Sequence, residues 1–242
     1  MLLRDDARGW HDIGAPDQPF DRRVVQHGGV TDIELITSSL VELTTDRLRR
    51  EILRGAFAPG DKIVEEQVTR RFGISRAPLR EALRLLAQQG LVEHLPRRGV
   101  RVATLSEDDV DELFELREVL ERHALEVSLP VPAVALDRLR VELAAMEVAA
   151  NRGDGPEEAD AHRRFHTALV ALSGRRQLLL AYEPVLLKLQ LSMATNLRRE
   201  AELELPQAGV RRHRELFQAL LTGDPDQVLT VLANHGARTY LH

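Results

Sequence analysis

The sequence contains no cysteine, so disulfide bonds and thiolate chemistry are both excluded. Aspartates at 5, 6, 12 and 17 interrupt the N-terminal segment before the apolar core of a secretory signal could form. No run of about 18 apolar residues occurs, which argues against a membrane-spanning helix. The HExxH motif of zinc hydrolases is also missing. We therefore expect a cytoplasmic protein that is not an enzyme.

Charge is distributed unevenly along the 242 residues, whose net charge is -5. Residues 38–104 contain 13 Lys and Arg against 8 Asp and Glu, a net charge of +5. Residues 1–37 and 105–242 have net charges of -3 and -7. Because phosphates repel acidic surfaces, only the basic segment suits a nucleic acid.

The basic segment has the pattern of a winged helix-turn-helix. A first helix is predicted from about Leu40 to Ala56, with Thr44 or Thr45 as its N-cap. The other predicted elements are a brief strand at 62–64, a helix at 65–72 ended by Gly73, a helix that Ser75 caps and that runs to about Gln89, and strands at 91–95 and 100–103. This order of elements makes DNA the first partner to consider.

After Leu105 the strand pattern disappears. Helices are predicted at 106–128, 132–151, 156–173, 175–200, 208–222 and 225–241, separated by short breaks that contain Gly, Pro or Ser. Ser106 and Asp109 resemble a capping box at the first of them. The fold class is therefore mainly α: a flexible extension at 1–37, a winged helix-turn-helix at 38–104, and an all-helical bundle at 105–242.

Three arginines mark a candidate DNA-contacting face. Arg76, Arg80 and Arg84 follow one another at intervals of four residues, so they share one side of a helix. Apolar residues occupy its other side, so this helix could enter a major groove, where Arg pairs with guanine or phosphate. The alternative is an ordinary solvated basic helix, and the surrounding helix and hairpin pattern favours DNA.

The rest of the candidate DNA surface lies at the start of this helix and in the predicted wing. Ser75 and the free N–H groups beside it suit a phosphate. Gly99 would allow the wing backbone to approach a minor groove. Arg97, Arg98 and Arg101 add positive charge there.

These segments resemble the GntR family of bacterial transcriptional regulators. The matching text is EILRGAFAPGDKI followed by FGISRAPLREALRLLAQQGLVEHLPRRGVRV. The helical body resembles the FCD ligand-sensing domain of the FadR subgroup, through LFELREVLERHAL, RRFHTALVALSG and RRHRELFQALLTGD. The resemblance covers about residues 40–242.

This resemblance implies a homodimer on a pseudo-palindromic operator, and a small effector, often a carboxylate, that changes DNA affinity. Arg76, Arg80 and Gly99 match DNA-contacting positions of the family. Glu66 stands where relatives often have a basic residue, which puts a DNA contact from position 66 in doubt.

Four of the nine histidines form a candidate metal site. His162 and His166 are separated by four residues, so both project from one side of a helix and can chelate one ion. His213 and His235 lie on two later predicted helices. Imidazoles that converge inside a bundle prefer Zn²⁺ or Ni²⁺ to Mg²⁺ or Ca²⁺. The alternative is that the histidines are structural or exposed.

The family resemblance implies a metal at this place. His166, His213 and His235 match three histidine positions that bind one metal in many FCD domains. His162 stands at a position that is usually Asp, so the implied site has four neutral donors. Asp160 is six residues from His166 and therefore lies on a different side of the helix.

An effector carboxylate needs a cationic partner beside the metal. Arg117 lies on an otherwise apolar side of the LFELREVLE helix and could pair with it through a bidentate fork. The alternative is an interhelical salt bridge. Asn196, together with Ser192 and Thr195, could complete the pocket from the 175–200 helix.

Three functions are compatible with these residues. The first is a dimeric regulator, usually a repressor, that responds to an organic acid. The second is a regulator that senses the metal directly. The third is a metallohydrolase with an accessory DNA-binding domain, which lacks a recognisable general base.

Overall fold

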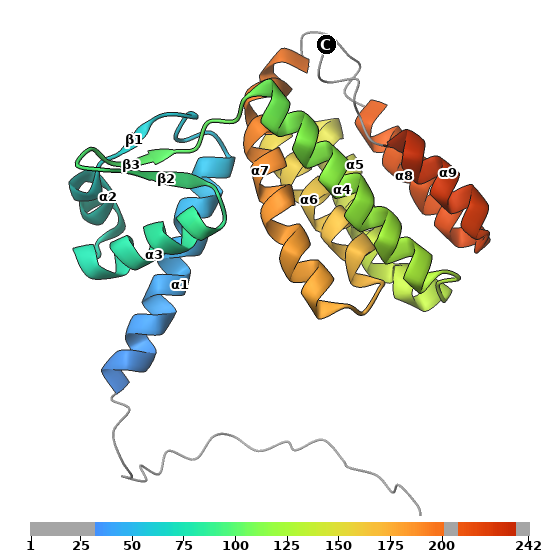
Figure 1. Ribbon diagram of the computed structural model, residues 1–242, viewed down its shortest axis with the longest axis horizontal. Coiled ribbons are helices and arrows are strands. Elements are labelled where there is room, and N and C mark those ends of the chain that lie inside the picture. The colour runs from blue at the N-terminus through green and yellow to red at the C-terminus, as the bar shows by residue number, and fades with distance from the viewer. Residues whose placement is uncertain (1–31, 201–207, 236–242) are drawn as a thin grey trace, which may run out of the picture.

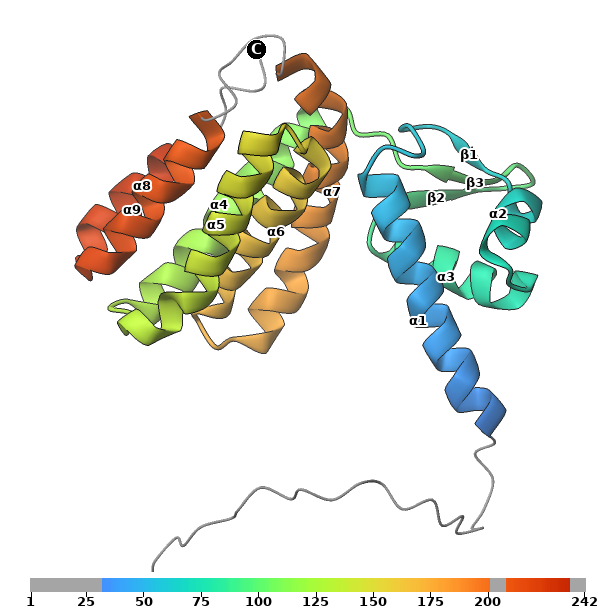
Figure 2. The same ribbon diagram turned by 180° about the vertical axis from the view of Figure 1, so that it is seen from behind.

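The chain folds into a small head that contains a sheet and a larger body of helices. The computed structural model describes the backbone of residues 32–200 and 208–235, and the side chains of residues 40–192 and 209–235. Within these residues the head lies on one side of the body, and helices α8 and α9 lie on the opposite side (Figure 1, Figure 2).

The head is a winged helix-turn-helix, as the sequence predicts. Its elements are α1 (Asp32–Leu53), β1 (Lys62–Ile63), α2 (Glu65–Phe72), α3 (Arg76–Gln88), β2 (Val92–Leu95) and β3 (Gly99–Val102). The three antiparallel strands are ordered β1-β3-β2, with Val92 opposite Val102 and Leu95 opposite Gly99. Gly73 ends α2 in the left-handed conformation, with a φ of 68°.

Helix α1 differs from its predicted form in two respects. It begins at Asp32 rather than near Leu40, so it extends into the segment predicted to be a flexible extension. Residues 1–31 of that segment lie outside the described residues. The predicted N-cap is wrong, because Thr44 and Thr45 lie inside the helix, where their hydroxyls donate to the carbonyls of Leu40 and Val41. A threonine can bond back to its own helix as well as cap one.

The head core lies between two helices and the sheet. Most of its buried side chains come from α1, α3 and the strands, among them Leu48, Ile52, Leu79, Leu83, Leu86, Val92, Val100 and Val102. The spacing of three and four residues along α1 and α3 places their apolar side chains on facing sides. The opposite side of α3, with its arginines, is thereby left exposed.

The body confirms the prediction of an all-helical bundle. Its elements are α4 (Glu107–Ser128), the 3-10 helix η1 (Ala133–Leu136), α5 (Asp137–Arg152), α6 (Gly155–Ala171), α7 (Arg176–Glu200), α8 (Ala208–Thr222) and α9 (Pro225–His235). Helix α6 packs against α4, α5 and α7, and α8 packs against α5 and α9. Among the described helices, none is both long and apolar enough to cross a membrane.

Helix α4 begins at a capping box, as predicted. The Ser106 hydroxyl accepts a hydrogen bond from the backbone N–H of Asp109 at 3.1 Å. The Asp109 carboxylate accepts one from the backbone N–H of Ser106 at 2.9 Å. Two N–H groups that would lack partners in the first turn are thus satisfied at the connection between head and body.

Helix α7 joins the head to the body through apolar packing. Leu187 and Leu191 of α7 are buried in the head core. The turn after α3 also approaches α7 closely. A Cβ atom at Gly90 would lie 2.9 Å from the Lys188 side chain, and Gly90 has a φ of 74°. A residue without a side chain therefore suits this contact.

Replacement of the cap tests the stability of this connection. We expect Ser106→Ala to lower the free energy of unfolding by about 0.5–2 kcal/mol, because one N–H group of α4 loses its acceptor. Urea unfolding followed by circular dichroism measures the change. Ser128→Ala, which removes a hydroxyl bonded only to the carbonyl of Leu125, is the control and should cost less than about 0.5 kcal/mol. Equal losses in both variants would contradict the role of the cap.

Candidate functional site

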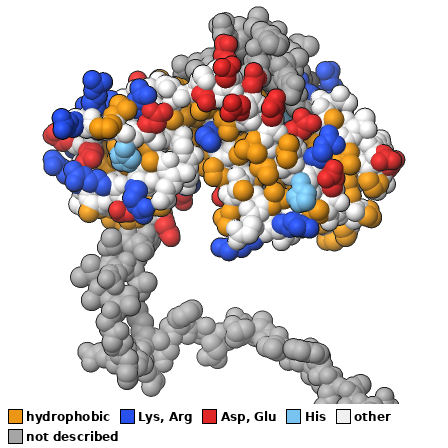
Figure 3. Space-filling view, in the orientation of Figure 1, with side chains coloured by type: hydrophobic (Ala, Val, Ile, Leu, Met, Phe, Trp, Pro, Cys, Tyr) orange, Lys and Arg blue, Asp and Glu red, His pale blue; other side chains and the backbone are white. Residues whose placement is uncertain are grey.

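The first candidate site is the exposed side of α3. Arg76, Arg80 and Arg84 are all exposed, whereas Leu79 and Leu83 between them are buried in the head core. Lys and Arg side chains gather on the outer side of the head, while Asp and Glu side chains are prominent on the top of the body (Figure 3). The structure therefore brings the three arginines together on one surface, as their spacing predicts.

Two of these arginines have acidic neighbours within the head. The Arg80 guanidinium donates to Glu65 of α2 at 3.0 Å, and that of Arg84 donates to Glu81 at 3.0 Å. Both arginine side chains remain more than half exposed, at 63% and 56%. Exposed ion pairs of this kind are weak, about 0–1 kcal/mol, so a phosphate or a guanine can displace the carboxylate.

The wing presents two further arginines from a tight turn. The backbone N–H of Arg98 donates to the carbonyl of Leu95 at 3.0 Å, which closes the turn between β2 and β3. Arg97 has a φ of 62° and Gly99 a φ of 89°. Arg97, Arg98 and Gly99 are exposed at the tip, whereas Arg101 pairs with Glu93 across the strands at 2.7 Å. The charge of Arg101 is therefore largely compensated.

Ser75 occupies the N-cap position of α3, but the prediction that its side chain caps the helix is wrong. It precedes α3 in an extended conformation, and its side chain accepts no hydrogen bond from the first turn. The Ser75 side chain is exposed at the start of α3.

The second candidate site is a cluster of four histidines from three helices of the body. His162 and His166 belong to α6, His213 to α8 and His235 to α9. His166, His213 and His235 are buried, and His162 keeps partial access to solvent. The centroids of the four rings lie between 4.4 and 5.2 Å apart in five pairings.

The ring nitrogens of this histidine cluster point toward one another. The Nε2 atoms of His166 and His213 are 2.9 Å apart, and those of His166 and His235 are 3.4 Å apart. The Nδ1 atom of His213 lies 2.7 Å from the carbonyl oxygen of Gly209. That contact selects the tautomer with the proton on Nδ1, which leaves Nε2 as a free electron-pair donor.

Burial keeps these imidazoles neutral. It is the largest cause that lowers the pKa of all four histidines, and it lowers the pKa of His213 to about 4. The Arg117 guanidinium and the neighbouring rings act in the same direction on His166 and His235. A neutral imidazole has the electron pair that a metal ion requires.

A buried ion pair from α4 lies beside the histidine cluster. The Arg117 guanidinium donates to Glu121 at 2.9 Å, and its Nη2 atom lies 2.8 Å from Nε2 of His166. The Tyr182 hydroxyl of α7 donates to the same Glu121 carboxylate. Burial, the largest cause, acts to lower the pKa of Arg117, but Glu121 and Tyr182 together outweigh it, so the pKa of Arg117 is raised. The pair is formed within α4, rather than between helices.

The geometry of the histidine cluster suits a transition metal. Two nitrogens bound about 2.1 Å from one ion lie about 2.9–3.4 Å apart at bond angles near 90–110°. The Nε2 separations of 2.9 and 3.4 Å fall in this range. Candidate donor atoms of His162, His166 and His213 lie within 4.8 Å of one another. The Nδ1 atom of His235 is buried without a hydrogen-bond partner, so its ring is not fixed by a second contact.

The sequence did not predict two residues of this site, and two of the predicted effector contacts remain predictions. Glu121 and Tyr182 were not predicted, although Arg117 and Glu121 stand four residues apart on one helix, a spacing that favours an ion pair. Of the predicted effector contacts, Ser192 is half-buried in α7. Thr195 and Asn196 belong to the same helix, but their side chains lie outside the described residues.

A winged helix-turn-helix head joined to a helical body is the architecture of a transcriptional regulator. Residues 40–102 match the family described as bacterial regulatory proteins, gntR family. Residues 112–238 match the FCD domain. The chain therefore belongs to the GntR family of transcriptional regulators and has an FCD domain.

Two curated relatives illustrate this membership. The HTH-type transcriptional regulator YdhC of Bacillus subtilis is 36% identical over 135 residues, which is 55% of this chain and 60% of that protein. The chain thus matches less than two thirds of the Bacillus protein. A protein of Paenarthrobacter nicotinovorans, named a probable D-xylose utilization operon transcriptional repressor, is 29% identical over 209 residues, 86% of this chain and 90% of its own length.

Solved structures show the same fold. A GntR transcriptional regulator from Rhodococcus sp. RHA1 matches with a TM-score of 0.75 at 24% identity, over 84% of this chain and 96% of that one. The E. coli protein McbR/YncC matches with a TM-score of 0.69 at 22% identity, over 83% and 94%.

Removal of the buried carboxylate tests the charge balance of the site. We expect Glu121→Ala to destabilise the protein by about 3–5 kcal/mol, because Arg117 would remain buried without its counter-ion. Thermal and urea unfolding measure the loss. Glu118→Ala, on the same helix, removes a half-exposed partner of Arg122 and should cost at most about 1 kcal/mol. A Glu121→Ala protein as stable as the control would mean that the pair does not balance a buried charge.

Proposed function

We propose that this regulator binds a pseudo-palindromic operator as a homodimer, and that a small organic acid bound beside a divalent metal ion changes its operator affinity. The observation that supports this most directly is the convergence of His166, His213 and His235, from three helices, beside the buried guanidinium of Arg117. A polar cluster of this kind inside a bundle is costly to bury, which favours a ligand-binding role over a purely structural one.

In the DNA complex, α3 enters the major groove. Arg76 and Arg80, nearest its N-terminal end, donate to guanine O6 and N7. The remaining residues bind the backbone or support it: Ser75, Arg84, Arg97, Arg98 and Gly99. One head covers a single half-site, and two-fold symmetry of the protein then accounts for the symmetry of the operator.

In the helical body, the histidine cluster holds a Zn²⁺ or Ni²⁺ ion through neutral imidazole nitrogens. His166, His213 and His235 supply three donors, and His162 supplies the fourth. With four nitrogen ligands, a five- or six-coordinate metal would leave a coordination position for an effector carboxylate oxygen. Arg117 shares its charge between Glu121 and His166, and it can turn one edge toward an effector carboxylate. Asn196 would contact the rest of the effector.

The regulation follows from unequal affinities. In the dimer, the two heads can take more than one orientation relative to the bodies. An effector that binds one of these conformations better than another shifts the population of dimers toward that conformation. If the favoured arrangement holds the two heads at the wrong spacing, operator affinity falls. The protein is then a repressor that its effector releases from DNA.

The DNA contact is tested by Arg76→Ala. We expect a loss of about 1–3 kcal/mol at an operator selected from random duplexes, together with weaker discrimination at one base pair, because a bidentate guanine contact is lost. Fluorescence anisotropy measures both affinities. Arg214→Ala, which removes an exposed arginine of the body that pairs with Glu147, is the control and should leave both values unchanged. An equal loss on operator and random DNA would instead make Arg76 a phosphate contact.

The metal site is tested by elemental analysis of protein purified without a metal-affinity tag. We expect about one Zn²⁺ or Ni²⁺ per chain in the wild type. His213→Ala should lose most of it, because each ligand of a three- or four-donor site contributes strongly to the metal affinity. His123→Ala, with an exposed imidazole on α4, is the matched control and should retain the metal.

Three outcomes separate the possible functions of the histidine cluster. Full metal content in His213→Ala would remove His213 from the site. No metal in the wild type would reject the metal-dependent effector pocket, while DNA binding would stand. A change in operator affinity with metal alone, and no further change with any carboxylic acid, would favour direct metal sensing.

A further inference from the structure

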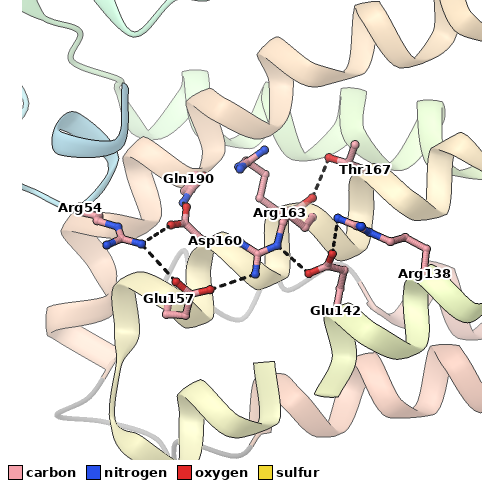
Figure 4. A network of polar contacts seen from close by, with 9 residues as sticks. Arg54, Arg138, Glu142, Glu157, Asp160, Arg163, Thr167 and Gln190 are labelled. Atoms are coloured by element: carbon pink, nitrogen blue, oxygen red, sulfur yellow. Dashed lines mark hydrogen bonds and ion pairs between the residues drawn. The ribbon is translucent and has the colours of Figure 1, made fainter. Parts of the chain in front are cut away.

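Helix α6 borders both the histidine cluster and the head. His162 and His166 project from it into the cluster. Asp160 precedes His162 by two residues, which is about 200° around the helix, so it faces nearly the opposite way. There its carboxylate meets Arg54, the first residue after α1 of the head (Figure 4). One helix therefore presents ligand-binding groups on one side and a head contact on the other.

Asp160 is held firmly at this contact. Its side chain is buried, with 7% of the residue exposed. The amide of Gln190 on α7 donates to Oδ1 at 2.8 Å, and Nη2 of Arg54 donates to Oδ2 at 3.1 Å. The two oxygens thus have separate partners, one in the body and one in the head. A buried carboxylate with two charge-assisted or polar partners tolerates little displacement.

Glu157, one turn earlier on α6, strengthens the same contact. The Nη2 atom of Arg54 also lies 3.2 Å from Glu157 Oε2. The other oxygen of Glu157 accepts from Arg164 at 3.1 Å, and Arg164 in turn pairs with Glu142 of α5 at 2.7 Å. Arg54 is therefore bound to a network that involves α5, α6 and α7 of the body.

Within the head, α1 is linked directly to the DNA-contacting helix. Leu48 and Ile52 of α1 share the head core with Leu83 of α3. The Arg49 guanidinium donates to the side chain of Gln89, the residue that ends α3, at 3.1 Å. A displacement of Arg54 would therefore be carried by α1 to α3 as one packed unit.

We propose that the ion pairs of Arg54 with Asp160 and Glu157 couple the histidine cluster to the orientation of the DNA-binding head. This inference rests on the proposed metal site. It names the contacts through which occupancy of that site changes the affinity for DNA. A ligand that draws His162 and His166 of α6 toward His213 of α8 and His235 of α9 rotates or shifts α6. Asp160 and Glu157 move with α6, and Arg54 moves α1 and α3 with them.

The coupling is measured with zinc as the probe, on the full chain and an operator selected from random duplexes. Operator affinity is determined for chelator-treated and zinc-loaded protein, and zinc affinity is determined with and without operator. Linkage requires both ratios to be the same. We expect a ratio of about tenfold in the wild type, and a ratio within about twofold of one in Arg54→Ala. Zinc content should stay at the wild-type level, because Arg54 does not contact the histidines.

Two further variants control for charge and for folding. Arg50→Ala removes an exposed arginine from the last turn of α1, one turn before Arg54, and it should keep the wild-type ratio. Arg54→Lys keeps the charge and can reach one carboxylate, so it should give an intermediate ratio. The Arg54 side chain is 47% exposed and Asp160 keeps the hydrogen bond from Gln190, so the replacement should leave the fold intact.

The outcomes distinguish this inference from the function on which it rests. A wild type that binds no zinc rejects the proposed metal site, and this coupling with it. A wild type that binds zinc with no effect on operator affinity overturns the coupling alone. So does an Arg54→Ala protein that retains the full ratio, because the communication then passes through another contact.

Discussion

Helix α7 is the element on which the arrangement of this protein depends, because its side chains belong to the cores of both parts. Leu187 and Leu191 are buried in the head core, whereas Tyr182 and Leu186 are buried in the body against α4 and α6. Apolar surface buried on both sides of one helix fixes the head to the body more firmly than exposed ion pairs could. The contacts of Gly90 with Lys188 and of Arg54 with Asp160 add to this apolar interface between head and body.

The interior of the body shows what such packing makes possible. Burial lowers the pKa of every histidine in the cluster, so the imidazoles enter the bundle as neutral donors. The buried positive charge of Arg117 is balanced by Glu121, whose carboxylate also accepts a hydrogen bond from Tyr182. A site assembled in this way is close to neutral, and hydrogen bonds orient Arg117, Tyr182 and His213 within it.

Local patterns in the sequence predicted the elements well where short-range physics decides them. The capping box at Ser106, the left-handed Gly73 and the outward arginines of α3 follow from spacings of three and four residues or from glycine stereochemistry. Thr44 and Thr45 were assigned wrongly, because a hydroxyl that can cap a helix can also bond to its own backbone. Whether such a threonine caps a helix or lies inside it depends on where the helix begins, and α1 begins at Asp32.

By itself, the sequence determined the family, the mainly α fold and the division into a basic head and an acidic body, since these depend on periodicity, charge and motif spacing. Four histidines could be named, but only the tertiary structure brought those of α6, α8 and α9 within bonding distance of one another. It alone joined Arg54 to Asp160, 106 residues apart, and paired Glu121 with Tyr182. Contacts between distant segments depend on how whole helices pack, and no spacing along a single helix specifies that.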